Sequence, residues 1–397
     1  MKNGWTKKPL GDLCEVFADG DWIETKDQSP NGIRLVQTGN VGEGVFKDRG
    51  DKARYVSATT FKRLNCTEIF EGDCLISRLP DPVGRSCILP DTGERMITAV
   101  DCTIVRFDRK QLLPEFFNFY SQSLDYIAAV DHETTGTTRK RISRKRLGQT
   151  PIPAPPLPEQ RRIVGILDEA FAGIATAKAH AEKNLQNARA LFESHLNAVF
   201  TQRGEGWTDT TLGEACENLD SKRVPITKSK RVAGEYPYYG ASGIVDYVND
   251  YIFDEDLLLV SEDGANLLAR TYPIAFSVSG KVWVNNHAHV LRFPDMASQR
   301  FIEFYLNSIK LDPYVSGMAQ PKLNQKSLNS IPVPSPTLPQ RREIVANLDS
   351  LQDETQRLES VYQRKLAALD ELKKSLLHQA FSGELTEYNP SEMTWLA

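Results

Sequence analysis

Two stretches of the chain, residues 158–200 and 339–381, carry apolar positions at helical spacing and contain no proline after their first residue. In the second stretch the apolar residues recur at spacings of three, four and seven, which is typical of a coiled-coil seam. In the first, many of these positions are alanine, which allows a partner helix to approach closely. Each helix would extend roughly 64 Å, more than one small domain can cover. We therefore expect the two helices to pair; the alternative is that each packs on its own domain.

Outside these helices the apolar positions form short runs of the kind that buried strands show. Turn-forming Gly-Asp, Asn-Gly and Asp-Gly pairs separate the runs. Each run in the first half has a counterpart in the second, and the last pair is predicted to be helical. The matched runs are residues 74–77 with 257–260, 103–107 with 289–293, and 116–120 with 301–305.

A proline-rich segment precedes each long helix, and its spacing favours a stiff, extended polyproline conformation. Pro158 and Pro339 then suit the first helical position, where a missing N–H has no cost. Leu157–Val164 recurs as Leu338–Val345, and Gly4-Trp5-Thr6 recurs at a different offset as Gly206-Trp207-Thr208. The chain is therefore an internal repeat of a variable block followed by a shared tail.

The repeat predicts an α+β fold. Two strand-rich α/β domains would be joined by two long antiparallel coiled-coil helices in a pseudo-two-fold repeat. The expected boundaries are 1–157 for the first domain, 158–203 for the first helix, 204–338 for the second domain, and 339–397 for the second helix and tail.

Composition and charge exclude several classes of protein. The 397 residues carry a net charge of −4, which does not suit a simple polycationic DNA coater. The first 150 residues have 23 basic and 21 acidic side chains, whereas residues 204–330 have 12 and 16. An acidic second domain argues against strong DNA binding by this chain alone. With no long apolar run, no signal-like start and six cysteines without a C-x-x-C pair, we expect a cytoplasmic protein with reduced thiols and no membrane span.

Catalytic motifs are missing from the sequence. There is no phosphate-binding P-loop and no Asn/Asp-Pro-Pro-aromatic tetrad of an adenine methylase. His287 and His289 lie two residues apart, but no further ligand stands at metal-binding spacing. We therefore expect no catalytic centre and no metal. The alternative is that Glu262 and Asp263 form a nuclease triad with Lys281.

The order of variable domain, long helix, variable domain, long helix resembles the specificity subunit of type I restriction–modification systems. The Gly-Trp-x4-Leu-Gly starts and the Leu157-Pro158-Glu159-Gln160 approach carry the resemblance. It implies that the chain binds double-stranded DNA, with each domain reading half of a bipartite target and the helices setting the gap. It also implies two modification (methyltransferase) subunits as partners, with restriction/motor subunits able to join. The chain itself would hold no cofactor; S-adenosylmethionine, and ATP with Mg²⁺, would bind the partner subunits.

Candidate contacts come from basic stretches, matched loops and the helix starts. The DNA-contacting candidates are Lys47, Arg49, Arg54, Arg78, Arg85, Lys222, Arg223, Lys230, Tyr238, Tyr239, Asn266 and Arg270. The partner-binding candidates are Pro158, Gln160, Arg161, Pro339, Arg341 and Arg342. One departure from the repeat is that Arg341 stands where the first helix has Gln160.

Two other classes of protein remain open at this stage. A coiled-coil adaptor whose domains bind proteins would show no dependence on DNA. A nuclease with an unrecognised site would cleave DNA in a metal-dependent way. The sequence does not identify the target bases.

Overall fold

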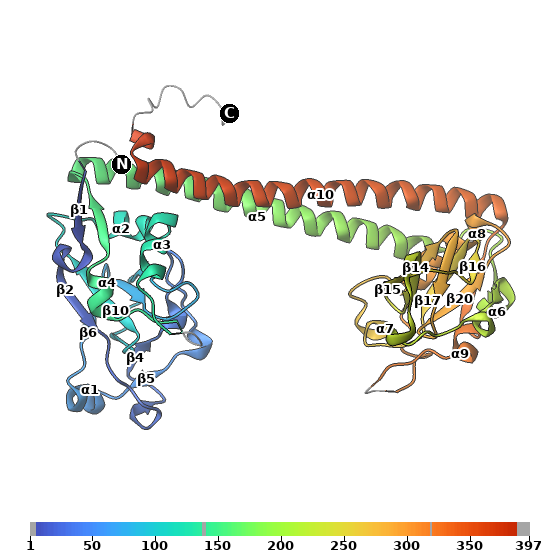
Figure 1. Cartoon of the computed structure of the whole chain (residues 1–397), viewed down its shortest axis with the longest axis horizontal. Helices are drawn as coiled ribbons and strands as arrows, with labels where there is room; N and C mark the ends of the chain where they lie inside the picture. Colours follow the sequence, from blue (N-terminus) through green and yellow to red (C-terminus); the bar gives the residue numbers. More distant parts are fainter. Residues whose placement is uncertain (1–4, 137–139, 318–319, 387–397) are drawn as a thin grey trace. The chain divides into compact units, whose positions relative to one another are not determined.

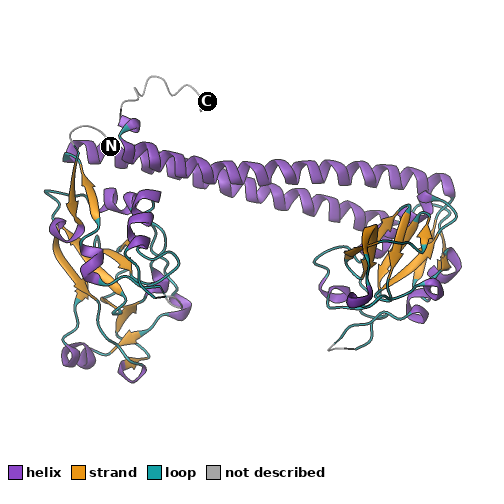
Figure 2. Ribbon diagram, in the orientation of Figure 1, coloured by secondary structure: helices purple, strands orange, loops and turns teal. Residues whose placement is uncertain are grey.

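The computed structural model describes residues 5–136, 140–317 and 320–386. Of the repeat's signature residues, Gly4 lies outside these ranges. The chain divides into two compact units, one formed by residues 1–181 with 364–397 and the other by residues 182–363. Each unit has its own sheets and its own hydrophobic cores (Figures 1 and 2). Among the described residues, none of the helices combines the length and the hydrophobicity of a membrane span.

The first unit contains two main sheets. One is antiparallel, with the order β2-β10-β7-β8; its strands are Cys14–Asp19, Cys102–Phe107, Cys74–Ser77 and Ser86–Ile88. The other has five strands in the order β3-β5-β4-β9-β6, at Gln28–Ser29, Tyr55–Val56, Ile33–Val36, Met96–Thr98 and Glu68–Ile69. The short α-helices of the first unit are α1 (Ala58–Leu64), α2 (Pro114–Tyr120), α3 (Leu124–His132) and α4 (Arg144–Gly148).

The second unit repeats the antiparallel sheet. Its order is β13-β20-β17-β18, with strands at Glu217–Asn218, Ala288–Arg292, Leu257–Ser261 and Ala275–Val278. A further sheet has the order β15-β14-β19-β16, at Gly243–Val248, Ala233–Gly240, Lys281–Val284 and Phe253–Asp254. The helices of this unit are α6 (Leu212–Ala215), α7 (Asn266–Ala269), α8 (Met296–Ser308) and α9 (Gln325–Asn329).

The proline-rich approaches are short strands, which corrects the polyproline prediction. β11 (Pro151–Ala154) pairs with β1 (Thr6–Pro9), and β21 (Pro332–Ser335) pairs with β12 (Thr208–Thr211), both antiparallel. Proline is tolerated here because each sheet has only two strands, so a missing N–H can face outward. The pairing ties the start of each variable block to the start of its long helix.

The two long helices are α5 (Leu157–Gln202) and α10 (Leu338–Ser382). They pair in antiparallel fashion within each unit. In the first unit Lys178 of α5 forms a salt bridge with Asp370 of α10. In the second, Arg189 Nε of α5 lies 2.9 Å from Glu359 Oε1 of α10. The predicted α+β fold with paired helices is confirmed, and the alternative of two separately packed helices is wrong.

Both helices contribute to both cores. In the first unit Ile163 and Leu167 near the start of α5 pack with Leu377 and Phe381 near the end of α10. In the second unit the arrangement of the two helices is reversed, and the end of α5 packs beside the start of α10. Each core therefore needs the end of a helix that begins in the other unit.

An equivalent aromatic contact occurs in each core, where a phenylalanine near the end of a long helix packs against a phenylalanine and a tyrosine. The Phe381 ring lies 5.4 Å from Phe116 and 5.0 Å from Tyr120, measured between ring centroids. The Phe200 ring lies 5.3 Å from Phe301 and 5.2 Å from Tyr305. Such edge-on contacts add to the burial of the ring itself.

Phe381→Ala should destabilise the first unit by about 3–5 kcal/mol, because the missing ring leaves a cavity among Phe116, Tyr120 and their neighbours. Hydrogen exchange should rise in α2 and the last turns of α10. Phe200→Ala is the matched change and should act on α8 of the second unit instead. Equal loss of protection in both units from either variant would contradict this assignment.

Candidate nucleic-acid interface

The predicted DNA contacts fall into two groups in the structure. The first group consists of exposed cations that form no salt bridge with any described residue: Lys47, Arg49, Arg54, Lys222 and Lys230. The second group is buried or half-buried and bonded internally. Only the first group presents its charge freely to solvent, as a phosphate contact requires.

The exposed cations of the first unit follow a tightly fixed loop. Asn40 accepts a hydrogen bond from the backbone of Gln37 (2.9 Å) and donates to the carbonyl of Lys47 (2.9 Å). Arg34 holds Asp48 and lies 2.9 Å from Glu94, so its own charge and that of Asp48 are already neutralised. The loop thus presents the cations that follow from a rigid base.

Arg85 organises the same loop from inside. Its guanidinium donates to the backbone carbonyls of Val41 (2.7 Å), Thr38 (2.9 Å), Leu79 (2.7 Å) and Pro82 (2.9 Å). Arg78 is buried and donates to the carbonyl of Val100 at 2.5 Å. Burial lowers the pKa of both guanidinium groups. Both are committed to internal acceptors, so a DNA contact by either stays a prediction.

Arg223 has a similar role in the second unit. Its Nε donates to the carbonyl of Asp220 (3.1 Å), and one Nη donates to the carbonyl of Ala288 (2.8 Å) and to Glu262 (2.6 Å). Tyr238 is buried, and its hydroxyl accepts from the backbone N–H of Ile226 at 2.9 Å. These side chains fasten the segment that carries Lys222 and Lys230.

Three further predicted contacts also support loops. The Asn266 side chain accepts from the backbone N–H of Thr271 and donates to the carbonyl of Tyr272, both at 2.9 Å. Arg270 donates to the carbonyl of Ile309, just after α8, at 2.5 Å. Tyr239 is half-buried, with its ring 6.0 Å from that of Phe276. Their contact with DNA stays a prediction.

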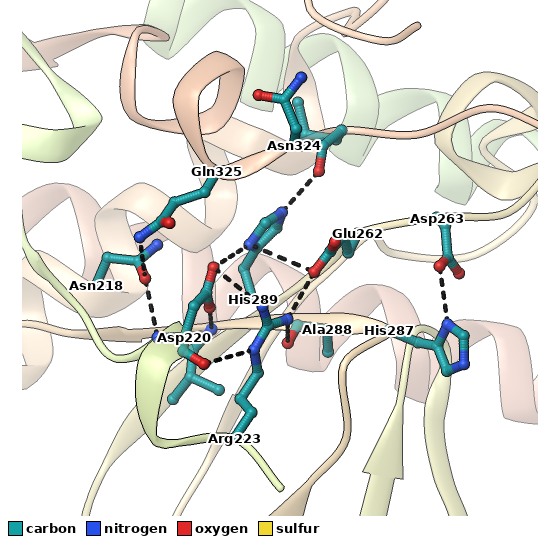
Figure 3. Close-up of polar contacts among 12 residues, drawn as sticks. Asn218, Asp220, Arg223, Glu262, Asp263, His287, Ala288, His289, Asn324 and Gln325 are labelled. Atoms are coloured by element: carbon teal, nitrogen blue, oxygen red, sulfur yellow. Dashed lines mark hydrogen bonds and ion pairs between the residues drawn. The ribbon is translucent and has the colours of Figure 1, made fainter. Parts of the chain in front are cut away.

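The second unit contains a buried cluster of charged side chains around His289 (Figure 3). His289 Nδ1 lies 2.6 Å from Asp220 Oδ2, and His289 Nε2 lies 2.7 Å from the carbonyl oxygen of Leu323. Each ring nitrogen of His289 therefore faces an oxygen atom at hydrogen-bond distance. Glu262 completes the cluster, 3.9 Å from the same Nδ1.

Asp220, Glu262 and His289 offer ligand atoms within 4.8 Å of one another, a spacing that a metal ion could use. The carboxylates are already engaged, however, because Arg223 and Lys322 bind Glu262 at 2.6 Å and 3.1 Å. Both imidazole nitrogens also face hydrogen-bond acceptors. The donor atoms are therefore already engaged by hydrogen bonds and ion pairs within the protein, which does not suit an open metal centre.

The electrostatics agree with this assignment. Burial by itself would raise the pKa of Asp220, but the hydrogen bond and charge of His289, with the charge of Arg223, outweigh it and lower that pKa. Burial also opposes ionisation of Glu262, yet Arg223, His289 and Lys322 lower its pKa. The cluster is held together in its ionised form.

Lys281 does not complete a nuclease-like triad with Glu262 and Asp263. Its ammonium lies 4.8 Å from the centre of the Tyr251 ring. Asp263 instead pairs with His287, 2.8 Å away.

The first unit carries a cluster of inverted sign at the same place. Arg78 corresponds to Glu262. The backbone N–H of Ile142 donates to the backbone carbonyl of Arg78, and in the second unit the backbone N–H of Leu323 donates to the backbone carbonyl of Glu262. Its partners are acidic, with Asp19 3.2 Å from Arg78. Both side chains are buried, which the sequence alone could not show.

The two helix starts differ. Gln160 is buried and donates to the carbonyls of Gln111 (2.8 Å) and Pro155 (2.7 Å). Arg341 is half-buried and donates to the hydroxyls of Ser298 (2.8 Å) and Ser335 (2.9 Å). The other predicted partner-binding residues are exposed: Pro158, Arg161, Pro339 and Arg342. The prediction of partner binding at these starts stays a prediction.

Comparison with known proteins decides the family. The model of the type I restriction modification DNA specificity domain matches twice, at residues 2–186 and 204–366. The chain belongs to this family of specificity proteins. The two matches fall on the two halves of the repeat.

Individual relatives share limited sequence identity with this chain. A type I restriction enzyme specificity subunit from Haemophilus influenzae is 39% identical over 140 residues, 35% of this chain and 36% of that protein. The EcoBI specificity subunit of Escherichia coli is 25% identical over 313 residues, 68% of this chain. The chain spans about a third of the first relative's length and 65% of the second's.

Solved structures share the fold. A chain from a type I R-M system, solved to explain its complex assembly and conformational transition, has a TM-score of 0.77 at 19% identity, covering 97% of this chain and 99% of that one. The HsdS subunit from Thermoanaerobacter tengcongensis has a TM-score of 0.60 at 20% identity, covering 97% and 98%.

The lowered pKa values of Asp220 and Glu262 make the second unit of this specificity protein sensitive to acid. A carboxyl whose pKa is lower in the folded than in the unfolded state stabilises the fold above its ordinary pKa, and this contribution is lost as the pH falls through the folded value. Asp220→Asn should cost on the order of 3 kcal/mol at pH 7. It should also flatten the fall of stability between about pH 5 and pH 3.

Urea unfolding at several pH values, followed by hydrogen exchange in β20, measures this dependence. Asp209→Asn is a suitable control, because Asp209 is an exposed acid paired with Arg203 at 2.7 Å. An unchanged pH profile in Asp220→Asn would show that the cluster does not stabilise the fold through its charges.

Proposed function

We propose that this chain is the specificity subunit that directs a type I restriction–modification complex to a bipartite DNA target. Each unit reads one half of the target, and the paired helices set the gap between the halves. The observation that carries the proposal is the repeat of one design in both units. In each, internally bonded arginine side chains fix a loop, and the exposed cations beside it form no salt bridge with a described residue.

The proposal assigns the chemistry to partner subunits. Two methyltransferase subunits would bind S-adenosylmethionine and dock along the helices and their exposed starts, such as Pro158 and Pro339. Restriction/motor subunits, using ATP and Mg²⁺, can join this assembly. The chain itself contributes DNA recognition and no catalytic group, and the complex acts in the cytoplasm, where the DNA is.

Sequencing of N6-methyladenine in cells that express this chain with its methyltransferase subunit tests the proposal. The expected result is one two-part motif with a fixed gap. Removing one heptad from each long helix shortens them by roughly 10 Å. The gap should then shorten by about three base pairs, at 3.4 Å per pair. Methylation that does not depend on the chain would contradict the proposal and favour the adaptor alternative.

The exposed cations of the first unit should contribute through phosphate contacts. Lys47→Ala/Arg49→Ala/Arg54→Ala should weaken binding of the assembled complex to target and non-target duplexes alike. If all three cations contact phosphates, the slope of log K against log salt should fall by roughly 3. Lys110→Ala is a matched control, an exposed cation with no salt bridge to a described residue. A selective loss for the target alone would mean that these residues read bases.

A further inference from the structure

Exposed apolar side chains are concentrated in one stretch of the second unit's sequence, and the hairpin within it contacts Tyr272. Of the seventeen large hydrophobic residues that are exposed in the described chain, seven lie within residues 224–272. Scattered exposed apolar residues need no explanation, but a concentration of them marks an interaction site. The seven are Val224, Val232, Ile244, Val245, Tyr247, Leu268 and Tyr272.

The centre of this group is the hairpin of β14 and β15. Its two-residue turn lies at Ala241 and Ser242. After Gly243, which begins β15, come Ile244 and Val245, 47% and 54% exposed. The turn is fixed to the sheet, because Ser261 Oγ donates to the Ala241 carbonyl at 2.5 Å. The Ser242 hydroxyl also lies 2.9 Å from that of Tyr272. The hairpin therefore presents its apolar residues on a rigid support.

The base of the same hairpin is bound to the most basic segment of this unit. Residues 222–232 contain five cations and no acid. Arg231 of this segment pairs with Asp246 of β15 at 3.1 Å, and its guanidinium lies 4.4 Å from the centre of the Tyr238 ring in β14. Lys222, Lys228 and Lys230 stay exposed and form no salt bridge with a described residue.

This combination selects one occupant. A protein that covered only the apolar residues would leave the lysines unused, and a simple anion would leave the apolar residues uncovered. Duplex DNA can engage both features. Its phosphates can bind the lysines, and its base edges or base steps can contact the apolar side chains. Apolar side chains recognise the thymine methyl group in the major groove or enter between base steps from the minor groove.

We propose that the β14–β15 hairpin reads bases for the second unit, with Ile244 and Val245 as its specificity-determining residues. The lysines of residues 222–230 hold the adjacent phosphates. The uncharged turn lets an otherwise acidic unit approach base edges without placing a carboxylate against the backbone of the DNA. This inference rests on the proposed function and names the element that carries out its recognition step.

The decisive variant is Ile244→Thr/Val245→Thr. Threonine keeps the β-branch that suits a strand but removes apolar contact surface. In cells that express the full chain with its methyltransferase subunit, the N6-methyladenine motif should become degenerate in one half and stay unchanged in the other. The unaffected half serves as an internal control. Leu124→Thr, an exposed apolar position in the first unit, should change neither half.

A second measurement uses the purified complex. The probes are the duplex with the mapped motif and the same duplex with one half scrambled. The hairpin variant should lower the ratio of the two affinities about tenfold, as expected for weakening one base contact, without changing the salt dependence. Lys228→Ala/Lys230→Ala should instead weaken both probes equally and lower the salt slope by roughly 2.

The outcomes separate the inference from the proposed function. If the unaltered chain yields no two-part motif, the proposed function fails. If it yields one and the hairpin variant keeps both halves intact, only the hairpin assignment is wrong. The hairpin variant could instead weaken assembly with the methyltransferase subunits and leave DNA discrimination intact. The exposed apolar residues of the hairpin would then form a protein interface, which also overturns the assignment. If the double variant unfolds, the single Val245→Thr variant is judged by the same criteria.

Discussion

The architecture depends on burying the ends of the two long helices. Phe381 at the end of α10 packs in the core of the first unit, and Phe200 at the end of α5 packs in that of the second. Each helix thus begins in one core and ends in the other. In each unit the end of the facing helix adds large apolar side chains to the core, so the variable block supplies only part of it.

This constraint explains why the variable blocks can differ so much while the tails repeat. Helix ends and the strands beside them must fit, and these parts match between the halves of the chain. The buried charged clusters differ more between the halves. Arg78 pairs with Asp19 in one unit and Glu262 with Arg223 in the other, so corresponding positions carry opposite charges.

The predicted interface shows the same separation of roles. A guanidinium group has five N–H donors, so an arginine near a loop serves equally well to bind phosphate or to bind the loop's own carbonyls. Arg85 and Arg223 do the second, whereas Arg49 and Lys230 are exposed and form no salt bridge with any residue that the structure describes. An arginine in the sequence is compatible with either role, and its burial in the structure distinguishes them.

The sequence by itself determined the repeat, the two long helices, the matched strands and the family, because periodicity and repeated motifs are properties of the chain. It could not determine that the proline-rich approaches are strands, because their pairing partners lie far away in the sequence. Nor could it place His289 between Asp220 and Leu323, or join the β14–β15 hairpin to the basic segment. The tertiary structure decided these points, because burial and partner choice depend on which distant residues the fold brings within a few ångströms.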